Sequence, residues 1–85
     1  MPIMHPIANL NGTSREELIT ARVKAYNALR DAMTAMVDLY PHMRDYLGNQ
    51  EAWQADRDIY NARFYAMYEI ANDIMDEAIS LQDHP

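Results

Sequence analysis

The chain has 85 residues, no cysteine and a formal net charge of −6. The lack of cysteine excludes disulfides and thiolate metal sites, and a chain of this length hides only about 60–65% of its surface when it folds alone. The whole charge excess lies in residues 51–85, because residues 1–50 carry five bases and five acids. This distribution argues against direct binding to DNA, RNA or an anionic membrane, each of which requires a basic surface.

Residues 1–12 form the first segment, which we expect to be an extended arm. It contains Pro2, Pro6 and the turn-favouring pair Asn11 and Gly12. It has neither a basic segment nor a long apolar run, so we expect no signal peptide and a cytoplasmic protein. The arm either frays or packs over the body of the protein or over a neighbouring subunit.

A helix is predicted to begin at the motif TSREE and to extend over about residues 14–47. Thr13 with Glu16 and Ser14 with Glu17 each fit a capping box, in which the hydroxyl accepts a hydrogen bond from a first-turn N–H group. Acidic residues in the first turn also suit the positive end of the helix dipole.

The predicted first helix has an unusually wide apolar face. Its central heptad series is Leu18, Ala25, Ala32, Leu39 and Tyr46, interleaved with Leu29, Met36 and Met43. The flanking series are Ala21, Ala28 and Ala35 on one side and Ile19, Tyr26, Met33, Tyr40 and Leu47 on the other. The apolar arc covers about 160°, which is more than a two-helix hairpin needs, so we expect a second partner, most simply another copy. The alanines either allow close helix packing or are there as good helix formers.

Pro41 interrupts this pattern. A proline inside a helix removes a hydrogen bond and clashes with the preceding turn, so we expect a kink, or a break followed by a short helix from Pro41 to Leu47. Gly48 then suits a left-handed helix cap, and Asn49 is a good residue to begin the next helix.

A second helix is predicted over about residues 50–82. Its heptad series is Trp53, Tyr60, Met67, Ile74 and Leu81, with Phe64, Ala71 and Ala78 between them. Two helices of similar length with a short connection predict an all-α, single-domain antiparallel hairpin over residues 1–85. Because a lone hairpin leaves apolar surface exposed, we expect several copies to assemble into a helical bundle.

Catalytic and metal-binding motifs are not found in the sequence. Asp38, His42 and Asp45 are spaced like ligands on one helix face, but Pro41 disturbs that face and a solvated surface is the better interpretation. No glycine-rich phosphate loop and no nucleophile with a nearby base are present. We therefore expect no enzyme activity, no metal and no cofactor.

The end of the second helix is rich in acids and tyrosines. These residues are the predicted partner-binding set: Glu69, Asp73, Asp76, Glu77, Tyr65 and Tyr68. Acids near a helix C-terminus oppose the helix dipole, and breaches of a local rule tend to mark function. The simpler alternatives are a solvated acidic face and tyrosines that fill an oligomer interface.

The sequence leaves three functions open. The first is a self-associating inhibitor or regulator, of the kind encoded by phages or mobile elements, that docks its acidic second helix on a basic protein surface; its place is then the host cytoplasm. The second is an oligomer that binds a small anionic ligand, such as a nucleotide, between its subunits; the arm-and-hairpin layout loosely resembles phage proteins that sequester cyclic nucleotides, but no motif carries this resemblance. The basic and aromatic residues available for such a ligand are Arg22, Lys24, Tyr26, Arg30, Arg57 and Arg63. The third is a structural component of a larger assembly.

Overall fold

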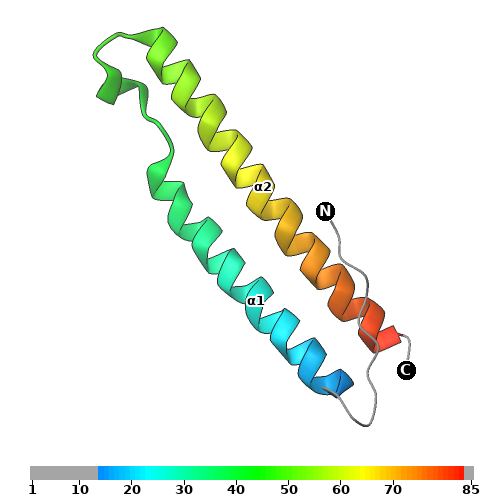
Figure 1. Cartoon of the computed structure of the whole chain (residues 1–85). Coiled ribbons are helices and arrows are strands. Elements are labelled where there is room, and N and C mark those ends of the chain that lie inside the picture. The colour runs from blue at the N-terminus through cyan, green and yellow to red at the C-terminus, as the bar shows by residue number, and fades with distance from the viewer. Residues whose placement is uncertain (1–13, 84–85) are drawn as a thin grey trace.

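The protein is an antiparallel hairpin of two long helices (Figure 1). The computed structural model describes residues 14–83, in which α1 spans Arg15–Met36 and α2 spans Gln50–Asp83. Two short 3₁₀ turns, η1 (Val37–Leu39) and η2 (Met43–Tyr46), connect them. The predicted all-α hairpin is confirmed. The predicted arm, residues 1–12, lies outside the described residues.

The start of α1 follows the predicted capping signal. Ser14 has an extended backbone, and its hydroxyl accepts a hydrogen bond from the Glu17 N–H group at 3.2 Å. Glu16 and Glu17 lie in the first turn, at the positive end of the helix dipole. Ser14 is therefore the N-cap, and Thr13 lies outside the described residues.

The first helix ends earlier than predicted. α1 stops at Met36, well before Pro41, and only η1 and η2 continue towards residue 47. A proline disfavours helical geometry at the residue before it, and Tyr40 accordingly has an extended ψ of 129°. The predicted break is confirmed, whereas the predicted continuation of one helix to residue 47 was wrong.

Two consecutive left-handed residues turn the chain into α2. Gly48 has a φ of 81°, as expected for a cap, but Leu47 also has a positive φ, of 49°. The Asn49 side chain then accepts a hydrogen bond from the Ala52 N–H group at 3.1 Å, which makes Asn49 the predicted first cap of α2.

The inner face of α2 is the one that the heptad series predicts. Ala71, Ala78 and Leu81 are buried. The other members of the series are half-buried: Trp53, Tyr60, Phe64, Met67 and Ile74. The indole N–H group of Trp53 donates to the Pro41 carbonyl at 3.0 Å and ties the connection to α2. Here sequence periodicity and packing agree.

The inner face of α1 is rotated from the predicted one. Met33 is buried and Tyr26 is half-buried, whereas Ala25 and Ala32 are exposed. The rotation turns large side chains towards α2, and burying them removes more apolar area from water than burying alanine. The predicted central series was therefore wrong at these two alanines, and the series predicted as its flank faces α2 instead.

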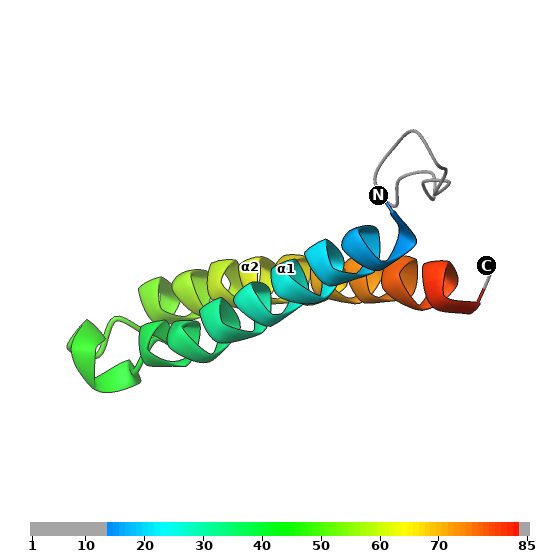
Figure 2. The same ribbon diagram turned by 90° about the horizontal axis from the view of Figure 1, so that it is seen from below.

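The hairpin is long and thin, as the two views at right angles show (Figures 1 and 2). It measures 62 × 20 × 19 Å, and its radius of gyration is 18.2 Å, against about 12 Å for a compact domain of this length. Its accessible surface is 6717 Å², against roughly 5,200 Å² for a typical monomer of this mass. Several large apolar side chains are consequently exposed.

Candidate functional site

A single stripe of exposed side chains runs along α2 on the side opposite its buried face. Its members are four and three residues apart, which is the spacing of one helix face. This outer stripe comprises Tyr65, Glu69, Asn72, Asp76, Ile79 and Asp83, all of them exposed. It alternates acidic residues with uncharged ones, of which the polar one is Asn72 and the large apolar ones are Tyr65, 64% exposed, and Ile79, 47% exposed.

Three of the predicted partner-binding residues lie in this stripe: Tyr65, Glu69 and Asp76. Tyr68 is exposed beside it. Asp73 is half-buried, and its position on α2 lies towards a different side of the helix. The structure thus brings together part of the predicted set and separates the rest.

Glu77 does not belong to the exposed acidic surface. It is 6% exposed, and its carboxylate accepts a hydrogen bond from the Arg22 guanidinium at 3.0 Å. Arg22 also donates to the Leu18 carbonyl at 3.2 Å. The Arg22–Glu77 ion pair joins the two helices, so the prediction of Glu77 as a partner-binding residue is corrected to a structural role.

Asn72, Ile79 and Asp83 complete the outer stripe but were not selected from the sequence; the last two carry its apolar and acidic character at the end of α2. The signal was available, because both follow Tyr65 and Asp76 at helical spacing and face away from the heptad series. Sequence reasoning grouped acids by proximity along the chain rather than by helix face, and this grouping mixed Glu77 with Asp76.

The acids of the outer stripe carry an unbalanced negative charge. Glu69, Asp76 and Asp83 form no ion pair with any residue in the described part of the chain, and α2 has no base after Arg63. Asp83 is the last residue of α2, where its carboxylate also opposes the negative end of the helix dipole.

A hollow of about 380 Å³ lies at the loop end of the hairpin. It is lined by Met36, Leu39, Pro41, Tyr46, Asp56, Ile59, Tyr60 and Arg63. Tyr60 makes an edge-to-face contact with Tyr40, with their ring centres 5.2 Å apart. The hollow therefore combines an aromatic and aliphatic floor with one acid and one base.

Tyr46 and Asp56 form the polar contact of this loop-end hollow. The Tyr46 hydroxyl donates to the Asp56 carboxylate at 2.8 Å. This hydrogen bond raises the pKa of Tyr46 above its ordinary value, because ionisation would remove the donated proton; partial desolvation and the negative charges of Asp56 and Asp45 act in the same direction.

The residues predicted for an anionic ligand do not form a common site within one chain. Arg22 is paired with Glu77, and Arg30 donates to the Tyr26 hydroxyl at 3.0 Å. Arg57 lies over the Trp53 ring at 4.9 Å and pairs with Asp58. Arg63 lines the loop-end hollow, far along the hairpin from Lys24.

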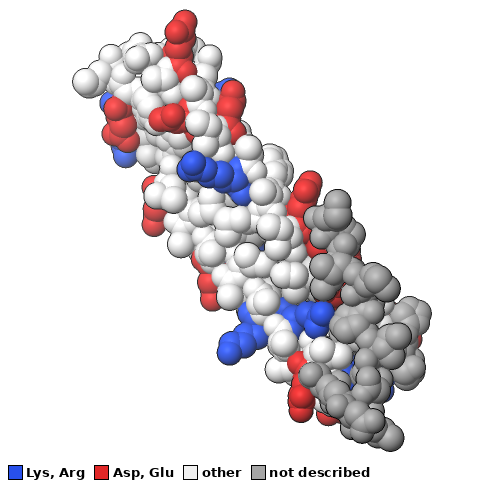
Figure 3. Space-filling model, in the orientation of Figure 1, with Lys and Arg blue, Asp and Glu red and all other residues white. Residues whose placement is uncertain are grey.

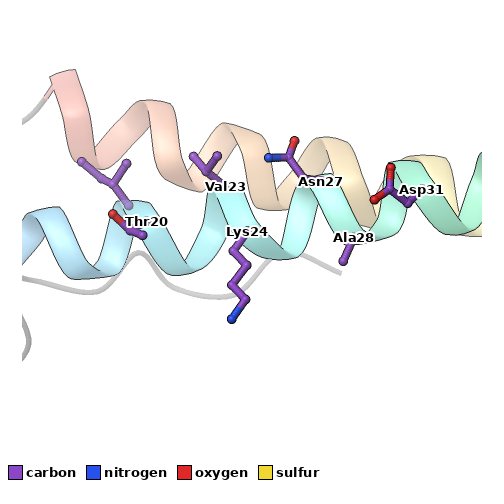
Figure 4. Close-up of a pocket in the computed structure, with 7 residues that line it drawn as sticks. Thr20, Val23, Lys24, Asn27, Ala28 and Asp31 are labelled. Carbon is purple, nitrogen blue, oxygen red and sulfur yellow. The ribbon is translucent and has the colours of Figure 1, made fainter.

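Lys24 lies in a shallow groove on the surface of α1 (Figure 4). All seven of the lining residues belong to this one helix: Ile19, Thr20, Val23, Lys24, Asn27, Ala28 and Asp31. The labelled side chains spread outwards from the helix instead of converging, and Lys24 extends away from it. One helix supplies only one wall, so these described residues alone do not enclose a ligand.

Residues 14–83 contain neither a helix apolar enough to cross a membrane nor a group of three acids or histidines placed to hold a metal ion. Comparisons with protein-family models, with curated proteins and with solved structures returned no match. The functional argument therefore depends on the surfaces of the hairpin.

Proposed function

We propose that this chain is a self-associating interaction protein that docks the outer stripe of α2 on a basic surface of another protein. The observation that carries the proposal is the stripe itself, in which exposed acids alternate with Tyr65 and Ile79. Large apolar side chains supply buried contact area, and neighbouring acids select a basic partner. An inhibitor or regulator of the kind encoded by phages or mobile elements fits this description.

The test removes the negative charges of the stripe with substitutions that keep the shape of the side chains. The variant Glu69→Gln/Asp76→Asn/Asp83→Asn should bind the partner about 3- to 150-fold more weakly at low salt, because three exposed charge contacts of roughly 0.2–1 kcal/mol each are lost. Its helix content should be unchanged. The loss of the Asp83 charge at the negative end of the helix dipole should stabilise α2 by about 0.3–1 kcal/mol.

The measurement begins with affinity capture from cells of the natural host, followed by calorimetry on the purified partner over a range of salt concentrations. The matched control is Asp38→Asn/Asp45→Asn/Glu51→Gln, which removes the same charge from exposed acids at the loop end. The proposal requires that the control bind as the wild type does. Equal binding by the stripe variant and the wild type would contradict it.

A further inference from the structure

The lining of the loop-end hollow shows which side chains of the two helices share one side of the hairpin. Leu39 of η1, which directly follows α1, and Ile59 and Arg63 of α2 face the same hollow. Residues seven apart lie on the same side of a helix in a hairpin of this kind. Leu39 therefore extends into one series along α1, and Ile59 and Arg63 extend into another along α2.

This shared side of the hairpin, which we call the flat face, consists mainly of small residues. On α1 it comprises Leu18, Ala21, Ala25, Ala28, Ala32 and Ala35, of which all five alanines are exposed. On α2 it comprises Ile59, Arg63, Ala66, Ile70 and Asp73, and both isoleucines are about half exposed. Figure 3 shows a band of uncharged atoms along the hairpin that is crossed by basic side chains and has acidic side chains mostly at its margins.

We infer that the flat face is the surface through which two copies of the chain associate into a four-helix bundle. The inference rests on the self-association proposed above and assigns it a surface. The outer stripe points away from α1, so a dimer formed through the flat face leaves the stripe available to a partner.

The accessible surface area of the chain is large enough for an interface with a second copy. The accessible surface exceeds that of a typical monomer of this mass by about 1,500 Å², whereas a stable interface buries roughly 800 Å² on each partner. Alanines spaced three and four residues apart also allow helices to approach near the short end of the usual 8–10 Å separation. One further hairpin laid along the flat face restores the compactness that a single copy lacks.

The charges of the flat face fit a second copy as the occupant. On α2 this face carries one base, Arg63, and one acid, Asp73. They lie five residues to either side of Tyr68, so they are placed symmetrically about that level of the hairpin.

A two-fold axis that lies in the plane of the interface at this level, at right angles to the helices, makes the surface complementary to itself. It places Arg63 opposite the partner's Asp73, and the same contact is repeated by symmetry. The two copies therefore run in opposite directions, with α1 against α1 and α2 against α2.

The first experiment measures self-association by sedimentation equilibrium of the full chain with no partner present. We expect a dimer whose dissociation constant rises at least tenfold in Ala28→Glu, which places a charge in the flat face. Ala62→Glu is the matched control, because Ala62 is an exposed alanine outside this face. Circular dichroism must show equal helix content in both variants. A monomeric wild type, or an equal loss in both variants, would overturn the inference.

The second experiment exchanges the charges of one predicted contact. Arg63→Asp and Asp73→Arg should each weaken the dimer, and the double variant should restore it. Arg63 and Asp73 are about 15 Å apart along one helix, so they cannot pair within a copy and recovery requires contact between copies. If each single variant weakens the dimer and the double variant does not restore it, the proposed pairing is wrong. Because no partner is present, these outcomes are separate from the test of the outer stripe.

Discussion

At the scale of single residues, two side-chain to side-chain contacts, besides the Trp53–Pro41 hydrogen bond, join the helices and their connection. Tyr46 joins η2 to Asp56 of α2, and Arg22 joins α1 to Glu77 near the opposite end. Neither contact was predicted, because helical periodicity shows which residues share a face but not which residues of two helices lie level. Their separation along the hairpin fixes the register of α1 against α2.

The Tyr46 contact should make stability depend on alkaline pH. Its pKa is raised in the folded chain, so the stabilisation is fully present below the unfolded value of about 10 and is lost as the pH rises through the folded value. Tyr46→Phe should lower the melting temperature at pH 7, and its difference from the wild type should shrink above about pH 10. Thermal melts at both pH values check this expectation. Tyr65→Phe, on the outer stripe, is the control and should behave as the wild type at neutral pH.

The Arg22–Glu77 pair should be sensitive to the loss of one partner. Arg22→Met leaves the Glu77 carboxylate nearly buried without its cation, which should cost about 3–5 kcal/mol of unfolding free energy. The double variant Arg22→Met/Glu77→Met should recover most of that loss, since apolar side chains can replace a buried ion pair. Chemical denaturation of the three proteins provides the measurement. A double variant as unstable as the single one would show that the pair does more than compensate its own charges.

At the scale of elements, the buried face of α2 was predictable from the sequence and that of α1 was not. The inner series of α2 has one large residue per heptad, with Phe64, Ala71 and Ala78 between them, so periodicity selects a single face. α1 has apolar residues over a much wider arc, and the series with Met33 and Tyr26 competes with the alanine series for the same neighbour. The series with the larger side chains faces α2 in the structure. Sequence spacing alone does not show which of the two series is buried. The same ambiguity left the outer stripe incompletely predicted.

The rotation of α1 gives a direct test. Met33→Ala should cost about 2–3 kcal/mol of unfolding free energy, because it removes a buried side chain and leaves space against α2. Ala25→Ser, at an exposed position of the predicted series, should change it by about 0.5 kcal/mol or less. Denaturant melts, performed at concentrations where the oligomeric state is known, measure both. The reverse ranking of these variants would restore the alanine series as the inner face.

At the scale of the whole molecule, composition and periodicity predicted the antiparallel hairpin and its excess of apolar surface. They did not predict how that surface is divided, because the division depends on the rotation of α1 and on the register between the helices. The structure separates a small-residue face from an acidic and apolar stripe. One chain therefore has two surfaces of different chemistry, each with its own proposed partner.

The antiparallel arrangement also determines how the hairpin responds to mechanical force. Arg15 and Asp83, the outer ends of the two helices, lie at the same end of the molecule (Figure 1). A load applied between them peels α1 from α2 one layer at a time, beginning beside the Arg22–Glu77 pair and finishing at the loop-end hollow. Backbone hydrogen bonds lie within the helices rather than between them, so only side-chain contacts resist the separation. We therefore expect the two helices to separate at low force when Arg15 and Asp83 are pulled apart.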